Sequence, residues 1–372
     1  MRVVVIGAGI AGISTGVGLA RQGVQVDVVE ANPNGEGTGA GITLLGNALR
    51  ALDELGVAEL CLDIGHGFDT IDIADSAGNV LMSEQPPRTF RPDRPAMLGI
   101  TRSALYTVLA GRAVESGATL RYQQTVTTIE QDDEGVDVTL STGEEVRADL
   151  VVAADGTYSS TRASVFGPER GPVYAGQGAW RLSFARPNDL DGMVLLRTAK
   201  GRAAGVIPTG PDLCYVFVLE TTAERARIPD EQLAELMAER LAEFSAPVVQ
   251  AGAAAIGDHN VGYRPFDIML MPAPWHRGRV VLIGDAAHAL TPQMTSGGGL
   301  AIEDAAVLSR LVGSGQPIPD VLETFSELRR PRVQRVYDAS LQICRWEQLA
   351  QFDRSLMQKL MGETHAFLAG AF

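Results

Sequence analysis

The sequence predicts an α/β fold, α+β overall, in which an antiparallel sheet is inserted into a domain built on a parallel sheet. Residues 3–6 have the pattern of a buried strand and residues 24–30 that of an alternating strand, and a helical segment of small and apolar residues separates them. Residues 173–268 contain short alternating strands between turns rich in Gly, Pro and Asp. Residues 279–283 again have the buried-strand pattern, and mostly helical sequence follows. We therefore expect the parallel sheet to be assembled from separate pieces of the chain.

The remaining elements follow from hydrophobic periodicity, which differs between helices and strands. Helices are expected at residues 10–22, 47–55, 102–115 and 230–244. Strands are expected at residues 120–128, 136–140, 150–154, 179–185 and 214–220. Because residues 132–135 are typical of a turn, the strands at 120–128 and 136–140 are expected to pair as a hairpin.

Composition and charge restrict the class of protein. With 372 residues, 45% of them hydrophobic, the chain is globular and long enough for two domains. The net charge of −14 argues against nucleic-acid binding, which needs a basic surface. Three scattered cysteines without metal-ligand spacing indicate a reduced, cytoplasmic protein with no metal site. The sequence contains no stretch of about 18 consecutive apolar residues, so we expect no stable membrane association.

The first motif is the run Gly-Ala-Gly-Ile-Ala-Gly at residues 7–12, which lies between a strand and a helix. In such a motif Gly7 makes a tight turn, Gly9 lets the backbone approach a pyrophosphate, and Gly12 allows close packing of helix on strand. Glu30 ends the second strand, where an acid accepts hydrogen bonds from ribose hydroxyls. This context predicts a Rossmann-type dinucleotide site and disfavours a glycine turn without a ligand.

The second motif, Gly284-Asp285, follows the late buried strand and precedes three glycines, residues 297–299, that open a helix. An aspartate at the end of a strand can bind a polyol chain. Glycines at a helix start can bring bare amides against a flavin ring and stabilise negative charge on it. An NAD enzyme has no use for such a ribityl site, so the motif favours FAD. His288 is expected to serve local packing and not to act as a catalytic base.

A third motif is Asp155-Gly156 with Arg162 six residues later, which alone is more often a simple turn. Together, the three ordered motifs resemble the group A flavoprotein monooxygenases, the p-hydroxybenzoate hydroxylase-like family. Residues 100–105, with Arg102, and 327–332 resemble further segments of that family. Within the family, the chain looks most similar to the salicylate, 6-hydroxynicotinate and urate hydroxylases.

The resemblance implies a single-component enzyme that uses FAD, NADH or NADPH, and O₂. It implies hydroxylation of a phenolic aromatic or heteroaromatic small molecule through a flavin hydroperoxide, by a monomer or homodimer. Epoxidation of an olefin is a rival reading, and a flavin redox protein without oxygenation is another. The cofactor-binding residues predicted from the motifs and the resemblance are Gly7, Gly9, Ile10, Ala11, Gly12, Glu30, Ala31, Ile42, Thr43, Arg102, Val126, Asp155, Gly156, Gly284, Asp285, Pro292, Gly297, Gly298, Gly299 and Leu300.

The same resemblance divides the chain into three parts. Residues 1–70, 98–168 and 270–315 would form a discontinuous FAD-binding domain. Residues 71–97 and 169–269 would form the substrate-binding sheet domain, and residues 316–372 a C-terminal helical segment.

The inserted sheet is expected to hold the substrate. Tyr215 and Arg202 resemble the tyrosine–arginine pair of the urate hydroxylases and would act as the catalytic residues. The two strands around the turn at 208–212 could present both side chains on one face. The alternative is a half-buried strand tyrosine and a solvated arginine. His259 and Trp180 are weaker candidates, for which core packing or surface exposure is the more ordinary explanation.

Overall fold

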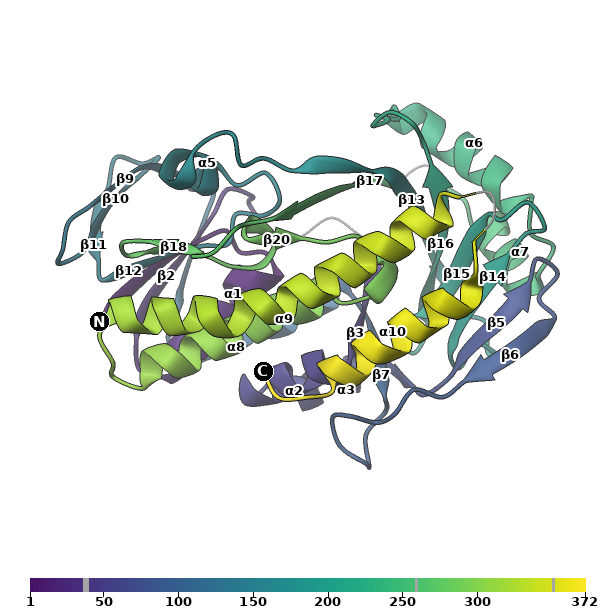
Figure 1. Cartoon of the computed structure of the whole chain (residues 1–372), viewed down its shortest axis with the longest axis horizontal. Helices are drawn as coiled ribbons and strands as arrows, with labels where there is room; N and C mark the ends of the chain where they lie inside the picture. The colour runs from purple at the N-terminus through teal and green to yellow at the C-terminus, as the bar shows by residue number, and fades with distance from the viewer. Residues whose placement is uncertain (36–39, 258–259, 350–351) are drawn as a thin grey trace.

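The computed structural model describes residues 1–35, 40–257, 260–349 and 352–372, and two large sheets form its framework (Figure 1). The first sheet has the strand order β18-β19-β12-β1-β2-β8. Its strands are β18 (His276–Arg277), β19 (Val280–Leu282), β12 (Leu150–Ala153), β1 (Arg2–Ile6), β2 (Gln25–Glu30) and β8 (Thr119–Tyr122). All neighbours are parallel except β18 and β19. The predicted parallel sheet is therefore present and is assembled from distant segments.

Strand alternation places different partners on the two faces of this sheet. Val3 and Val5 belong to the core shared with α1 (Ile10–Arg21), α4 (Arg102–Glu115) and α8 (Gly297–Gly313). Val4 and Ile6 instead pack against the three-stranded sheet of β9 (Val126–Gln131), β10 (Val136–Leu140) and β11 (Glu145–Ala148). Both faces are covered, which explains why the central strands are apolar from Val3 to Ile6 in β1 and throughout β12.

The expected hairpin at 120–128 and 136–140 is only partly correct. Residues 119–122 are β8, which pairs with β2 in the parallel sheet. The strand that pairs with β10 begins at Val126. Gln123 separates the two strands and has a φ of 56°, a left-handed conformation that ends the first strand.

The second large sheet has the order β20-β17-β13-β16-β15-β14-β5-β6. Its strands are β20 (His288–Ala289), β17 (Val261–Leu270), β13 (Val173–Ala185), β16 (Leu213–Thr221), β15 (Ala203–Pro208), β14 (Met193–Arg197), β5 (Ile71–Asp75) and β6 (Val80–Glu84). Neighbours are antiparallel except β14 and β5. Helices α6 (Asp230–Leu241) and α7 (Pro247–Ala254) cover its outer face (Figure 1).

A second three-stranded sheet, of β3 (Gly41–Leu45), β7 (Met97–Thr101) and β4 (His66–Phe68), lies between the two large ones, in the order β3-β7-β4. The other helices are α2 (Gly46–Glu54), α3 (Ala58–Ile64), α5 (Ser160–Phe166), η1 (Gly284–Ala286), η2 (Pro292–Met294), α9 (Ile318–Glu347) and α10 (Arg354–Leu368). The long helix α9 contacts strands of both large sheets, and α10 returns along it (Figure 1). Within the described ranges, no helix is both long and apolar enough to cross a membrane.

Candidate active site

The glycine turn after β1 is fixed by packing at two of its three glycines. Gly7 has a φ of 95°, and a Cβ there would lie 2.6 Å from the carbonyl oxygen of Ala154. A Cβ at Gly12 would overlap the carbonyl oxygen of Gly7. At Gly9, by contrast, a Cβ would meet nothing within 4 Å. The backbone at Gly9 therefore faces open space at the N-terminus of α1, where an anionic group can approach.

Glu30 lies beside this turn and holds its shape. One carboxylate oxygen accepts a hydrogen bond from the backbone N–H of Ala8 at 2.7 Å. The other accepts from the backbone and side-chain amides of Asn32, both at 2.8 Å. Because these bonds fix the carboxylate next to the glycine turn, Glu30 is positioned to accept further hydrogen bonds from a bound nucleoside.

The Asp-Gly and Gly-Asp motifs are joined through Arg162. The buried Arg162 donates from Nη1 to the carbonyl of Ala286 at 3.0 Å and from Nη2 to the carbonyl of Thr157 at 2.8 Å. Asp155 accepts from the hydroxyl of Ser159 at 2.5 Å and so organises the start of α5. Asp285 stays exposed, with the Thr157 hydroxyl 3.2 Å from its carboxylate. Asp155 and Arg162 thus shape the site, whereas Asp285 is free to bind a ligand.

The glycines that open α8 leave a bare helix N-terminus. A Cβ at Gly297 would meet nothing within 4 Å, so the backbone amides there face open space. A Cβ at Gly298 would overlap the side chain of Ile42, which places β3 directly against this helix end. Gly299 packs on Ala48, where a Cβ would come within 3.1 Å. This end of the helix can therefore accept a flat ring without a side chain in the way.

A buried ionic network holds α8 behind the site. Asp304 accepts hydrogen bonds from the Gly284 backbone N–H at 2.9 Å, His288 Nε2 at 2.6 Å and Arg329 Nε at 2.7 Å. Burial alone would raise the pKa of Asp304, but His288 and Arg329 leave that pKa below its usual value of 3.8. His288 is fully buried in this network, as a packing role requires.

The adjacent Glu303 extends the network toward the C-terminal helices. Its carboxylate accepts from Arg332 through Nε and Nη2, both at 2.8 Å, and forms an ion pair with Arg329 at 2.7 Å. Asn47 of α2 donates to the same carboxylate at 2.7 Å. Burial opposes ionisation, but Arg329 and Arg332 keep the pKa of Glu303 below 4.5. Sequence analysis identified residues 327–332 only through the family resemblance. The structure shows that two arginines of this segment, Arg329 and Arg332, bind the acidic residues of the glycine-rich helix α8.

A cavity of about 1970 Å³ joins the glycine motifs to the inner face of the eight-stranded sheet. Typical sites for one ligand have volumes of roughly 300–1,000 Å³, so this cavity can hold a dinucleotide and a second molecule together. The predicted site residues that line it are Gly9, Ile10, Ala11, Ile42, Thr43, Arg102, Gly156, Tyr215, Asp285, Pro292, Gly297 and Gly298. The lining does not include the predicted residues Gly7, Gly12, Glu30, Ala31, Asp155, Gly284, Gly299 and Leu300. Val126 lines a separate small groove beside α5.

The expectation that Tyr215 and Arg202 share one sheet face is wrong. Tyr215 lies opposite Ile207 of β15 and faces the cavity. Arg202 points to the other face, where its Nε donates to Glu243 at 2.8 Å. The physical reason is the two-residue alternation of strands, because the register of β15 and β16 gives these two positions opposite parity.

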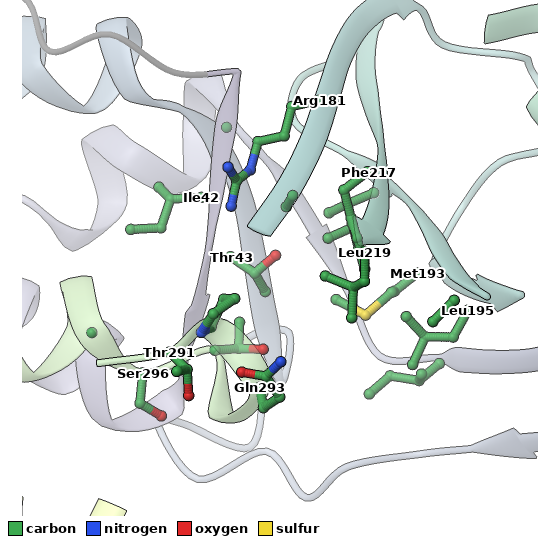
Figure 2. Close-up of a pocket in the computed structure, with 18 of the residues that line it drawn as sticks. Ile42, Thr43, Arg181, Met193, Leu195, Phe217, Leu219, Thr291, Gln293 and Ser296 are labelled. Carbon is green, nitrogen blue, oxygen red and sulfur yellow. The ribbon is translucent and has the colours of Figure 1, made fainter. Parts of the chain in front are cut away.

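Arg181 of β13 is the arginine that faces the cavity near Tyr215. Figure 2 shows its side chain reaching toward the strand that carries Ile42 and Thr43. Burial raises the pKa of Tyr215 although Arg181 and Arg102 act in the opposite direction, so its phenol is neutral near pH 7. Sequence analysis missed Arg181. Its only signal was its place in the alternating segment 179–185, between two apolar neighbours.

Trp180 and His259 were the weaker candidates for the substrate pocket. Trp180 is fully buried on the outer face, where Nε1 donates to Glu220 at 2.6 Å and the ring stacks against Arg240. Core packing therefore accounts for it. His259 lies outside the described residues.

Comparison with known proteins agrees with this geometry. A family model described as an FAD binding domain matches residues 1–340. A putative FAD-dependent monooxygenase of Bacillus subtilis is 30% identical, with 98% of each chain covered. The 2-heptyl-3-hydroxy-4(1H)-quinolone synthase of Pseudomonas aeruginosa is 32% identical over 90% of this chain and 86% of its own. The crystal structure of Klebsiella pneumoniae HpxO with FAD and uric acid has a TM-score of 0.85 and 25% identity, covering 99% of this chain and 95% of that one.

Proposed function

The chain belongs to the FAD binding domain family and is a group A flavoprotein monooxygenase, and from this we propose that it uses NADH or NADPH and O₂ to hydroxylate a heteroaromatic or phenolic small molecule. The observation that carries the proposal is that residues of the glycine motifs and Tyr215 line the same cavity. A cofactor held at the glycines and a ring held at Tyr215 would therefore meet in one space.

We assign cofactor binding to the backbone at Gly9 and at Gly297, and to the carboxylates of Glu30 and Asp285. Bound FAD supplies the electron transfer and oxygen activation that side chains cannot provide. The open space at Gly9 suits a pyrophosphate, because amides at the N-terminus of α1 favour negative charge. The exposed Asp285 suits the ribityl hydroxyls, and the bare end of α8 suits the flavin ring.

The chain positions the substrate on the inner face of the eight-stranded sheet, and we assign residues 71–97 and 169–269 to the substrate-binding sheet domain. Tyr215 is neutral near pH 7 because burial raises its pKa. Its hydroxyl therefore serves as a hydrogen-bond partner for a ring oxygen, and it does not act as an ionised base. Apolar side chains on this face, such as Phe217 and Leu219, would shield one side of the reacting ring from water.

The test is a screen of phenolic and heteroaromatic compounds for stimulated oxidation of NADH or NADPH in isotope-labelled O₂. We expect a product that carries one labelled oxygen on a ring carbon. A labelled epoxide would instead support an olefin epoxidase. Oxidation of NADH or NADPH without any oxygenated product would support a flavin redox protein and contradict the proposal.

A further inference from the structure

We propose that the substrate is amphipathic: a heteroaromatic ring whose oxygen accepts a hydrogen bond from Arg181, with an apolar tail that lies across β16, β15 and β14. The inference rests on the proposed function, because it assumes that the ring is held next to the cofactor. It concerns the inner face of the eight-stranded sheet, where a polar corner and an apolar wall meet.

Arg181 provides the polar corner. Two other arginines on or beside this sheet have acidic partners: Arg197 lies 3.5 Å from Glu347, and Arg202 lies 2.8 Å from Glu243. For Arg181, no ion pair or hydrogen bond to an acid is found among the described residues. Its charged neighbours are Arg102 and Arg264, which together with burial lower the pKa of Arg181.

A half-buried guanidinium without an acidic partner favours a ligand that supplies negative charge or a strong acceptor. The protein as a whole has a net charge of −14, and carboxylates such as Asp285 and Glu347 also line the cavity, so this concentration of positive charge is local to the corner around Arg181. Tyr215 shares the corner and can bind the same ring oxygen. Together, these two side chains would fix the ring by its oxygen substituent.

The apolar wall follows from strand register. Arg181 lies opposite Phe217, Phe217 opposite Gly205, Gly205 opposite Leu195, and Leu195 opposite Ile73. A Cβ at Gly205 would overlap the ring of Phe217, so that ring lies over the glycine. The row therefore runs from a guanidinium onto aromatic and aliphatic side chains. From β13 to β14 it spans three strand spacings, or about 14 Å.

The neighbouring rows broaden this wall with Met193 and Leu219. Figure 2 shows Phe217, Leu219, Met193 and Leu195 gathered on one side of the cavity, away from Thr43, Thr291 and Ser296. A small polar ring would leave this wall in contact with water. An apolar tail would cover it, with a gain of about fourfold in affinity for each methylene that becomes buried.

The test is a titration of the FAD-loaded enzyme with 4-hydroxyquinolines that carry a 2-methyl, 2-propyl, 2-pentyl or 2-heptyl group. Binding is read from the change in flavin absorbance, which does not require turnover. We expect Kd to fall by about two- to fourfold per methylene. Leu195→Asn and Leu219→Asn should flatten this dependence. Arg181→Gln should raise Kd by about tenfold or more for every member and leave the dependence on chain length intact.

Arg202→Gln is the matched control, because it removes an arginine from the opposite face of the same sheet and should leave every Kd unchanged. A Kd that does not vary with chain length, or that is the same in Arg181→Gln, would overturn the inference. If the enzyme hydroxylates the ring without a tail and Kd does not depend on tail length, the amphipathic substrate is contradicted but the proposed hydroxylation is supported. Length-dependent binding without any oxygenated product would support the amphipathic site and contradict the proposed hydroxylation.

Discussion

Asp304 binds the backbone of Gly284, the residue before Asp285, and we expect removal of the two carboxylates to affect different properties: stability for Asp304 and FAD affinity for Asp285. Asp304 is fully buried and accepts three hydrogen bonds, from Gly284, His288 and Arg329. Asp304→Ala leaves the buried Arg329 with one carboxylate partner instead of two. Breaking a buried ion pair in this way typically costs about 3–5 kcal/mol of unfolding free energy.

Asp285 is exposed, and its only described partner is the hydroxyl of Thr157 at 3.2 Å. Asp285→Ala should therefore change the unfolding free energy by less than about 0.5 kcal/mol. If its carboxylate binds the ribityl chain, the loss of one charge-assisted hydrogen bond should weaken FAD binding by about 1.5–3 kcal/mol, or roughly 10- to 150-fold.

Urea unfolding of the apoprotein measures the first quantity, and fluorescence titration with FAD measures the second. We expect the unfolding free energy to fall in Asp304→Ala only. We expect Asp285→Ala to lose FAD affinity while its unfolding free energy stays unchanged. A change below about 1 kcal/mol in the unfolding free energy of Asp304→Ala would refute the assignment of the network as a buried support. Unchanged FAD affinity in Asp285→Ala would refute its role at the ribityl chain.

Three further predictions follow from the same geometry. Gly9→Val should abolish FAD binding in a chain that still folds, because the new side chain enters the open space that the cofactor needs. Gly12→Val should unfold the protein, because its side chain clashes with Gly7. Circular dichroism measures folding and flavin titration measures binding, so together they distinguish the two variants. Tyr215→Phe should slow hydroxylation by up to about a hundredfold and divert NAD(P)H consumption to hydrogen peroxide, with FAD content unchanged; tight coupling in the variant would return Tyr215 to a packing role. Folding lowers the pKa values of Asp304 and Glu303, so the stabilisation by these carboxylates is present above their ordinary pKa values of 3.8 and 4.5 and is lost as the pH falls below them. The urea concentration at the midpoint of unfolding should therefore decrease once the pH is below about 4.5. This decrease should be less steep in Asp304→Asn.

The glycine motifs could be predicted from sequence because their geometry depends on local sterics. Only glycine fits at position 7, with its positive φ, and at position 12, where any Cβ overlaps the preceding turn. The strand before the motif and the helix after it are equally local. These features need no knowledge of the rest of the chain, and so the parallel domain and its cofactor class could be predicted.

The substrate side could not be predicted because it depends on strand register. The pairing of Ile207 with Tyr215 fixes which positions of β15 share a face with Tyr215, and Arg202 is excluded by parity. That register is set by the turn at 209–212, whose geometry cannot be read from composition. Arg181 shows the same limit, since the alternation at 179–185 was visible but not the face that meets the cavity.

The buried ionic network was beyond sequence analysis for another reason. Asp304 and Arg329 are 25 residues apart and belong to different helices, α8 and α9. In the sequence of either helix alone, a charged residue is ordinarily expected to be solvated. Only the packing of the two helices brings the charges together and buries them.

The two faces of the eight-stranded sheet give the protein a simple route to new specificities. Odd-numbered positions such as 179, 181, 217 and 219 line the cavity, whereas even-numbered neighbours such as 180, 182, 216 and 218 form the core beneath α6 and α7. Point substitutions at the odd positions can therefore diversify the ligand with little loss of the hydrophobic core. A combinatorial library for altered selectivity should vary these positions alone. A one-residue insertion or deletion in β16 would instead turn the core side chains toward the cavity and the cavity side chains toward the core, and so disrupt both.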